Sequence, residues 1–297
     1  MILGKLQREH VWRRIAVERL TEPLHLNLVA AFVALFAPYR TKVAFDLILR
    51  QPYAYGVLRA ADLAAAAGFG SVTVIECGVG AGTGLLNLGK VAARTRGATG
   101  IEVKVVGFDT GKGLPPPADY RDHPEMYQGG DFPMDIDEVR RALPENTRLV
   151  LGPLSETVPK FIEQLETGSP IGFVAVDVDY YSSAVDSLAL LTHPDSNRYL
   201  ALPMIYLDDI SNEGHNSWCG ELLAVAEFNS ANKLRKIEQD RFLETRRLFK
   251  NARWLRNTYL LHVLDHPSAQ RLKVSRPVYD PGNSYWAGEN RKRSEIQ

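Results

Sequence analysis

Residues 71–84 read Ser-Val-Thr-Val-Ile-Glu-Cys-Gly-Val-Gly-Ala-Gly-Thr-Gly, and they set the architecture of the chain. Four of the first six residues are β-branched, and this run predicts a buried strand. Glycines then alternate from 78 to 84, and glycine lets the backbone turn sharply and approach a bound molecule closely. A helix predicted from Gly84 to Ala93 follows, and a helix N-terminus favours negative charge. A strand, a glycine-rich turn and a helix in this order indicate a site for a nucleotide-type cofactor.

Two kinds of nucleotide-type cofactor use such a loop, and the spacing of the glycines separates them. The dinucleotide fingerprint is Gly-x-Gly-x-x-Gly. Counted from Gly78, the third glycine position holds Thr83, and counted from Gly80 it holds Leu85. The loop instead fits acidic-x-Gly-x-Gly-x-Gly, with Glu76 at the end of the strand. A nicotinamide-dependent oxidoreductase is therefore disfavoured.

Beyond this loop, short β-branched runs alternate with amphipathic segments. Strand and helix alternate about six times, which predicts a parallel sheet covered by helices on both faces. Ligands of such sheets bind outside the carboxyl ends of the strands. The predicted strands are 71–76, 102–108, 148–151, 171–176, 204–207 and 258–264, and the predicted helices in this region are 84–93, 137–143, 156–165, 182–191 and 221–228.

The two ends of the chain have different patterns. Residues 1–68 predict an N-terminal helical extension with a buried helix at 28–37, an apolar run about half the length of a membrane span. Residues 69–265 form the predicted cofactor-binding domain, and 266–297 a loosely structured tail. Residues 233–256 carry nine Lys and Arg against three acids, which we interpret as the solvated face of a helix. The alternative is contact with an acidic partner, a substrate phosphate or RNA.

The overall composition is that of an ordinary globular protein. The 297 residues are 45% hydrophobic and 24% charged, and 35 Lys plus Arg balance 35 Asp plus Glu. Zero net charge argues against a protein that coats nucleic acid or an anionic membrane, so neither is an expected partner. Two cysteines, Cys77 and Cys219, cannot form a disulfide framework, and the N-terminus lacks the apolar core of a signal peptide. We expect a cytoplasmic protein.

Acidic residues follow three of the predicted strands. Asp109 follows the second strand, where a carboxylate can accept both ribose hydroxyls of a nucleoside. Asp177 follows the fourth strand, and Asp208 and Asp209 follow the fifth. Three carboxylates at one rim suit Mg²⁺, which keeps several waters, and like charges this close need a cation or protons. In the structural alternative, Asp109 forms a turn, Asp209 caps a helix and Asp179 makes loop hydrogen bonds.

Several motifs together resemble the macrocin and mycinamicin O-methyltransferase family, within the class I methyltransferases that use S-adenosylmethionine. The glycine loop is similar to the first motif of that class. The other motifs are Gly-Phe-Asp-Thr-Gly-Lys-Gly-Leu-Pro (107–115), Gly-Asp-Phe (130–132), Leu-Val-Leu-Gly (149–152), Phe-Val-Ala-Val-Asp-Val-Asp-Tyr-Tyr-Ser-Ser (173–183) and Leu-Asp-Asp (207–209). The resemblance covers roughly residues 70–230. It implies a Rossmann-like sheet of about seven mostly parallel strands, S-adenosylmethionine and Mg²⁺ as cofactors, and methylation of sugar hydroxyls on natural products.

The resemblance also implies roles for the residues that match the motifs. Glu76 would lie near the ammonium of S-adenosylmethionine, and Asp177 would lie beside the reacting hydroxyl as a candidate catalytic base. The other implied cofactor-binding residues are Gly78, Gly80, Gly82, Asp109 and Gly152, and the implied Mg²⁺ ligands are Asp177, Asp208 and Asp209. The chain departs from the family at 110–112, where Thr-Gly-Lys replaces Ser-Phe-Glu or Ser-Phe-Gln, and at Val178, where the family usually has glycine.

Features outside these motifs add further hypotheses. His215, in the long segment after Asp209, is a candidate general base because imidazole titrates near the working pH; the alternative is a surface histidine. The long loop Gly113–Met134 is a predicted lid over cofactor and substrate, with a disordered connection as the alternative. The N-terminal helices are a candidate surface for a homo-oligomer.

Rival chemistries have weaker patterns. His262 and His266 are spaced as in helical zinc sites, but the predicted strand would separate them by roughly 13 Å. The sequence has no Gly-x-Ser-x-Gly elbow, no zinc-type cysteine pairs and no Asn/Asp-Pro-Pro-Tyr/Phe signature of base methylation. We therefore expect an S-adenosylmethionine-dependent, Mg²⁺-assisted O-methyltransferase acting on a hydroxylated small molecule such as a sugar or glycoside. The alternative is a catalytically inactive, cofactor-binding regulatory or interaction protein.

Overall fold

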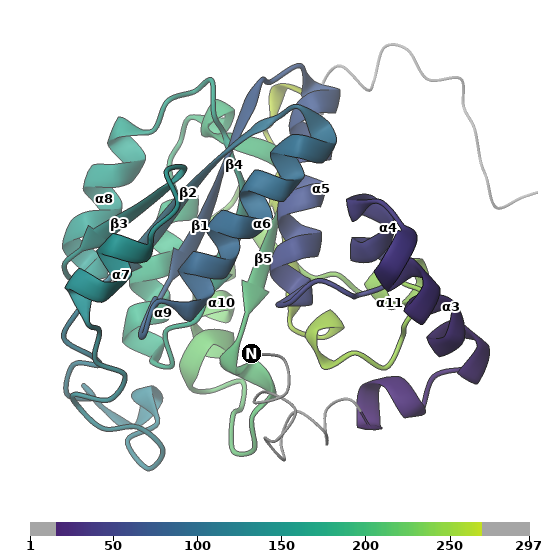
Figure 1. Ribbon diagram of the computed structural model, residues 1–297. Helices are drawn as coiled ribbons and strands as arrows, with labels where there is room; N and C mark the ends of the chain where they lie inside the picture. Colours follow the sequence, from purple (N-terminus) through teal and green to yellow (C-terminus); the bar gives the residue numbers. More distant parts are fainter. Residues whose placement is uncertain (1–15, 269–297) are drawn as a thin grey trace, which may run out of the picture.

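The computed structural model describes residues 16–268 and is built on a seven-stranded sheet (Figure 1). The strand order is β3-β2-β1-β4-β5-β7-β6. Strands β1 to β5 are parallel, and β7 is antiparallel to both β5 and β6. This confirms the predicted mostly parallel sheet, whose first five strands have the order of a Rossmann sheet. The strands are β1 (Ser71–Cys77), β2 (Glu102–Asp109), β3 (Thr147–Leu151), β4 (Ile171–Val176), β5 (Tyr199–Leu207), β6 (Arg235–Gln239) and β7 (Thr258–Val263).

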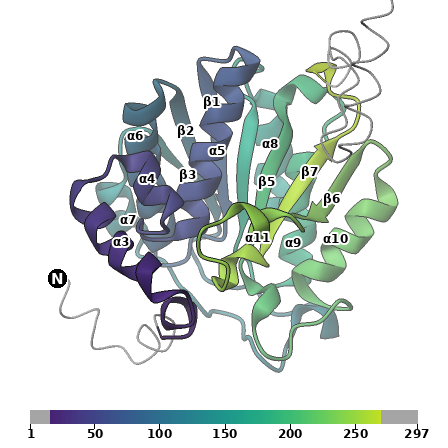
Figure 2. The ribbon, with the colours of Figure 1, turned by 90° about the vertical axis from the view of Figure 1, so that its right-hand side faces the viewer.

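Helices cover both faces of the sheet, as the alternating pattern predicts (Figures 1 and 2). In β1, Val72 and Val74 pack under α5 and α6, whereas Ile75 and Cys77 belong to the core under α8, α9 and α10. Side chains alternate between faces along a strand, so a strand buried on both sides is apolar throughout. The helices are α3 (Leu24–Phe36), α4 (Tyr39–Ala44), α5 (Gln51–Ala67), α6 (Thr83–Thr99), α7 (Ile136–Ala142), α8 (Leu154–Gln164), α9 (Tyr181–Leu188), α10 (Gly220–Ala231) and α11 (Leu243–Arg246).

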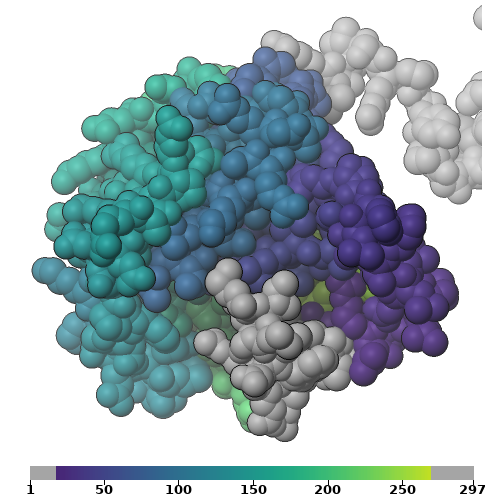
Figure 3. Space-filling model, in the orientation of Figure 1, coloured from purple at the N-terminus to yellow at the C-terminus, as the bar shows by residue number. Residues whose placement is uncertain are grey.

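The N-terminal helices are present, but the predicted burial of residues 28–37 is wrong. Within α3, Leu28, Phe32 and Leu35 are each about two-thirds exposed or more, and only Ala30 and Val33 are buried. The purple helices accordingly form the right-hand edge of the molecule in Figure 3. By contrast α5, which lies inside the predicted extension, packs against β4 and β5. The domain boundary at residue 68 remains a prediction.

The basic segment 233–256 is not a helix, so the predicted solvated helix face is wrong. It holds the edge strand β6, the short helix α11 and a 3₁₀ turn at Arg253–Leu255. Figure 2 shows β6 and β7 beside β5, with α11 in front of the sheet. The β6 sequence Arg-Lys-Ile-Glu-Gln has one apolar residue. Charged side chains are common on edge strands, where they discourage pairing with other chains. The segment therefore lacks the apolar alternation from which a strand is predicted.

Arginines of this segment bind carboxylates of the same chain. Arg235 is buried and pairs with Asp265. Arg247 is also buried; it donates to Asp46 Oδ1 at 2.5 Å and to the carbonyl oxygen of Val43 at 2.8 Å. The Glu22 carboxylate accepts hydrogen bonds from the backbone amides of residues 250 and 251. The basic segment therefore fastens the N-terminal helices to the sheet.

The C-terminal part confirms the strand over 258–264 and its consequence for the two histidines. His262 lies in β7, and His266 follows it, buried, with Nε2 3.0 Å from the carbonyl oxygen of Tyr199. The two therefore do not form a helical zinc pair. The predicted loose tail lies, beyond Ser268, outside the residues that the structure describes. Among residues 16–268, no helix has the length and apolar content needed to cross a membrane.

Candidate functional site

The ends of β1, β2 and β4 meet at Gly78. Its amide donates to the carbonyl oxygen of Phe108 at 2.9 Å, and the amide of Asp177 donates to the carbonyl oxygen of Cys77 at 2.9 Å. Gly78 has φ 82°, and a Cβ atom at this position would lie 1.7 Å from the carbonyl oxygen of Asp177. A side chain is excluded there on both counts. This contact places Asp177 directly beside the glycine loop.

Glu76 is the buried carboxylate of the site. It is 1% exposed, and its Oε1 accepts a hydrogen bond from the Tyr53 hydroxyl at 2.5 Å. Its Oε2 has no hydrogen-bond partner within residues 16–268. Burial raises the pKa of Glu76 to about 7, with the charges of Asp208 and Asp109 adding to the increase. A buried, half-satisfied carboxylate is suited to bind a cationic group.

The fourth glycine of the loop motif makes room for this carboxylate. A Cβ atom on Gly84, in the first turn of α6, would lie 2.0 Å from Glu76 Oε1. Glu76 therefore sits directly under the start of α6.

Asp109 holds the glycine loop in shape. Its Oδ2 accepts hydrogen bonds from the amides of Val79 at 2.8 Å and Gly80 at 2.9 Å, and its Oδ1 accepts from the amide of Gly111 at 2.6 Å. The amide of Gly152 donates to the carbonyl oxygen of Asp109 at 2.9 Å, so Gly152 lies beside it. Asp109 therefore has the turn-forming role that is the structural alternative to ribose binding. Ribose binding by Asp109 stays a prediction.

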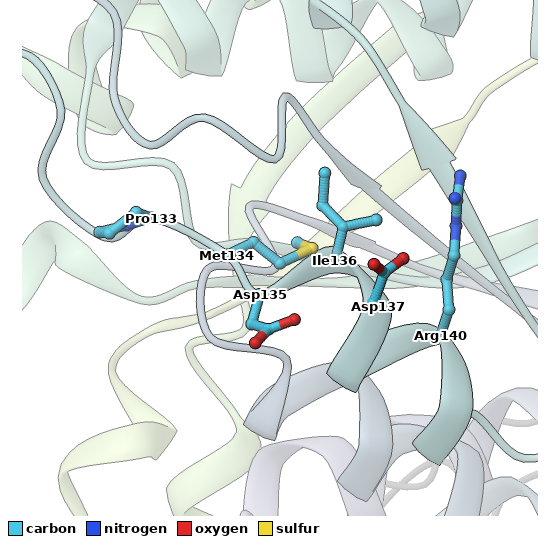
Figure 4. A pocket seen from close by; sticks show the side chains of 6 residues that line it. All are labelled: Pro133, Met134, Asp135, Ile136, Asp137 and Arg140. Atoms are coloured by element: carbon cyan, nitrogen blue, oxygen red, sulfur yellow. The ribbon is translucent and has the colours of Figure 1, made fainter.

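An open hollow of about 720 Å³ lies next to the glycine loop. It is lined by Pro133, Met134, Asp135, Ile136, Asp137 and Arg140, from the start of α7 and the segment before it (Figure 4). The same helix touches the loop, because a Cβ atom on Gly82 would lie 2.6 Å from Val139 Cγ2. Ile136 similarly fills the space beside Gly111. The start of α7 therefore forms one wall of the candidate cofactor site.

A second group of acids lies at the ends of β4 and β5. Burial raises the pKa of Asp177 well above its ordinary value, and the charges of Asp208 and Asp209 raise it further. Burial, followed by the charges of Asp179 and Asp208, raises the pKa of Asp209 to about 8. Glu221, in the first turn of α10, was not predicted; its pKa is raised by burial and by Asp209. Like charges this close require protons or a cation.

The donors of this acid cluster fit Mg²⁺ in their chemistry. All are carboxylate oxygens, and Asp209 Oδ2 and Glu221 Oε1 are buried without a partner among the residues described. Within residues 16–268, no three His, Cys, Asp or Glu side chains are arranged to hold a metal ion. Ligation by Asp177, Asp208 and Asp209 would need side-chain rotations toward one point. Their role as metal ligands stays a prediction.

Two site residues that the sequence analysis missed, Arg50 and Tyr53, come from the start of α5. Arg50 precedes the helix with φ 54°, and its guanidinium lies 3.4 Å from Tyr53 Oη, 3.4 Å from Thr83 Oγ1 and 3.9 Å from Asp177 Oδ2. Burial lowers the pKa of Arg50, but the surrounding Tyr53, Glu76 and acid-cluster groups raise it above its usual value. Pro52 marks the start of a helix, but no local pattern shows that this helix reaches the glycine loop.

His215 is connected to the acid cluster through a tyrosine of the long loop. Its ring stacks on His123 with centroids 4.7 Å apart, and its Nε2 lies 3.4 Å from Tyr127 Oη. Burial raises the pKa of Tyr127, and the charges of Asp209 and Asp179 raise it further. Burial and His123 lower the pKa of His215, which favours the neutral imidazole that a general base needs. Its catalytic role stays a prediction.

The predicted lid, Gly113–Met134, is tied to the start of α9. The buried Asp122 accepts hydrogen bonds from Ser182 N at 2.9 Å and from Ser182 Oγ at 3.2 Å. Arg121 Nη1 donates to Tyr181 Oη at 3.2 Å. The loop is thus an ordered segment beside the acid cluster. Its closure over a substrate stays a prediction.

No protein-family model matches the chain, and no curated protein matches it. Among solved structures, it is similar to the calicheamicin methyltransferase CalS11, with 19% identity over 69% of this chain and 83% of that chain, and a TM-score of 0.45. The O-methyltransferase NovP gives 18% identity over 60% of this chain and 71% of that chain, with a TM-score of 0.43. MycE, a methyltransferase of the mycinamycin pathway described in complex with Mg, SAH and mycinamycin VI, gives 12% over 74% and 57%, with a TM-score of 0.33. At these levels of similarity, we infer function from the residues of the site itself.

The raised pKa of Glu76 predicts a pH-dependent cost in stability. The folded protein keeps a proton on Glu76 up to about pH 7, whereas the unfolded chain releases it near 4.5. The free energy of unfolding therefore falls as pH rises from 4.5 to 7, and the loss is complete above 7. Glu76→Gln should raise the free energy of unfolding of the ligand-free protein by about 2–3 kcal/mol at pH 8 and much less at pH 5.

Urea unfolding at pH 5, 6.5 and 8 measures this difference. Glu102→Gln, an exposed residue of β2, is the matched control and should show no pH-dependent gain. An equal effect of Glu76→Gln at all three pH values would contradict the prediction.

Proposed function

We propose that the protein is an S-adenosylmethionine-dependent O-methyltransferase that acts on a hydroxylated small molecule such as a sugar or glycoside. The observation that carries this proposal is the backbone contact at Gly78. This contact brings Glu76, a buried carboxylate whose Oε2 has no hydrogen-bond partner among residues 16–268, next to the acid cluster that begins at Asp177. A buried carboxylate under a glycine loop, next to further carboxylates that could hold an acceptor hydroxyl, supports methyl transfer better than hydride transfer or hydrolysis. The motif resemblance supports the same conclusion.

The residues around the glycine loop would bind the cofactor. S-Adenosylmethionine, when bound, supplies a methyl group on a sulfonium sulfur that is already a good leaving group. Glu76 would accept the ammonium with its unpartnered Oε2. The glycines would let the backbone approach the ligand, and Asp109 would hold the loop in place through the amides of Val79 and Gly80.

The acid cluster would hold and deprotonate the acceptor. Transfer to oxygen needs the acceptor oxygen on the axis of the leaving group, with its proton removed. Magnesium, when bound, supplies Lewis acidity that lowers the pKa of a hydroxyl. Asp177, whose pKa lies above its ordinary range, is the candidate acceptor of that proton. Neutral His215, one tyrosine away, is the second candidate.

Calorimetric titration tests the cofactor. S-Adenosylhomocysteine should bind and NAD should not. The affinity for S-adenosylhomocysteine should rise about tenfold or more from pH 5.5 to 7.5, because the ammonium of this ligand needs ionised Glu76. Glu76→Gln should weaken binding and remove this pH dependence. If the wild-type protein does not bind S-adenosylhomocysteine, the proposed function fails; if it binds without methylating any sugar or catechol acceptor, the inactive cofactor-binding alternative is favoured.

A magnesium titration tests the metal. With S-adenosylhomocysteine present, the wild-type protein should bind one Mg²⁺, and Asp208→Asn plus Asp209→Asn should abolish that binding. Removal of two exposed carboxylates elsewhere, Asp62→Asn plus Glu163→Gln, is the matched control and should leave it unchanged. Unchanged Mg²⁺ binding in the aspartate double variant would remove the metal from the mechanism.

We also propose that a second copy of the chain covers α3. Its exposed apolar side chains are Leu24, Leu28, Val29, Phe32, Leu35 and Phe36. These six side chains recur at helical spacing on one face of α3, and an exposed apolar patch of this kind is typical of a protein–protein interface. The helix has no charged residue, so two copies related by a two-fold axis would pair apolar surface with apolar surface.

Light scattering on the full-length protein tests this self-association. The wild type should be a dimer, and Leu28→Glu plus Phe32→Glu should make it a monomer. Phe242→Glu is the control, because Phe242 is equally exposed away from α3 and should leave the dimer intact. A monomeric wild type would contradict the proposal and leave residues 1–15 or 269–297 as candidate occupants of this face.

A further inference from the structure

Arg50 is a charged group whose contacts in the structure leave its binding capacity largely unused. Within residues 16–268, its three side-chain polar contacts are all long: 3.4 Å to Tyr53 Oη, 3.4 Å to Thr83 Oγ1 and 3.9 Å to Asp177 Oδ2. A guanidinium binds a carboxylate most strongly through two parallel hydrogen bonds, and none of these contacts is of that kind. The side chain is about one-third exposed, so a ligand can reach it.

The start of α6 lies beside this guanidinium and favours the same kind of ligand. Thr83, which Arg50 contacts, is the first residue of this 17-residue helix. Its N-cap, Gly82, supplies no side-chain hydrogen bond to the free amides of the first turn. Free amides and the helix dipole together attract an anion. Arg50 and the first turn of α6 therefore both favour negative charge at one point.

Glu76 provides the opposite charge next to this point. It is buried under the first turn of α6, and its Oε2 lacks a partner among residues 16–268. The Tyr53 hydroxyl lies between the two charged groups, 2.5 Å from Glu76 Oε1 and 3.4 Å from Arg50 Nη1. Arg50 Nη1 and Glu76 Oε1 therefore lie no farther apart than these two distances combined. Arg50 supplies the positive charge of the pair and Glu76 the negative charge.

We propose that Arg50 and the first turn of α6 bind the carboxylate, and Glu76 the ammonium, of one zwitterionic α-amino acid group. Tyr53 holds the two charged side chains apart at the spacing that such a group needs. The inference rests on the proposed function, in which the zwitterion is the amino acid end of the cofactor. It assigns part of the cofactor site to α5, which lies before the region of motif resemblance.

Three ligands that share the 5′-thioadenosine part and differ in the chain on sulfur, and so in their charged groups, test this assignment by calorimetry. S-Adenosylhomocysteine carries both charges, its decarboxylated analogue keeps the ammonium alone, and 5′-methylthioadenosine has neither. Arg50→Met should weaken S-adenosylhomocysteine binding by tenfold or more and leave the other two ligands within about twofold, since a hydrogen bond to a charged group is worth about 1.5–3 kcal/mol. Arg50→Lys should restore part of the loss.

Glu76→Gln completes the comparison. It should weaken the first two ligands and spare 5′-methylthioadenosine. Arg94→Met, an exposed arginine of α6, is the matched control and should change none of the three affinities.

The outcomes separate this inference from the proposed function. If the wild-type protein binds none of the three ligands, the proposed function fails. If Arg50→Met weakens all three ligands equally, Arg50 shapes the loop and contacts no carboxylate, which overturns the inference. If Arg50→Met leaves S-adenosylhomocysteine unaffected and changes only Mg²⁺ binding, Arg50 serves to neutralise Asp177, which also overturns it.

Discussion

The close backbone contact between Gly78 and Asp177 is the constraint on which the rest of the site depends. A Cβ atom at residue 78 would overlap the carbonyl oxygen of Asp177, so the strand ends can meet only where a side chain is absent. Because they meet, Glu76 and Asp177 lie on the same rim of the sheet, one under the glycine loop and one at the start of the acid cluster. The chemistry proposed for each requires the other as its neighbour, since a methyl donor must face its acceptor.

The buried acids make the ligand-free site electrostatically unfavourable. Glu76, Asp177, Asp209 and Glu221 all have raised pKa values, with burial as the largest cause in each case. Such groups lower the stability of the folded protein near neutral pH, and a bound cation restores it. Arg50 relieves part of this cost at the edge of the cluster, close to both Glu76 and Asp177. A site arranged in this way favours positively charged groups, because Arg50 neutralises its carboxylates only in part.

The sequence predicted those features that depend on neighbours along the chain. β-Branched runs located the central strands, and the parallel arrangement placed Glu76, Asp177, Asp208 and Asp209 at one edge. Arg50 and Glu221 escaped prediction because each reaches the site only when its helix packs on the sheet. The composition of α3 indicated burial, but an apolar helix is buried only if something covers it, and no part of residues 16–268 does so. Strand β6 likewise escaped prediction, because its charged sequence is typical of a sheet edge and its position at that edge is known only from the fold.

The fastening of the N-terminal helices by Arg247 has a consequence for how the chain assembles during synthesis. Asp46 and its arginine are 201 residues apart in sequence. At a translation rate of about 5–20 residues per second, Asp46 leaves the ribosome roughly 10–40 s before the arginine that pairs with it. During that interval the apolar surface of α3 and the carboxylate of Asp46 are both present without the segment that holds these helices on the sheet. A segment made late in synthesis therefore completes the packing of the N-terminal helices.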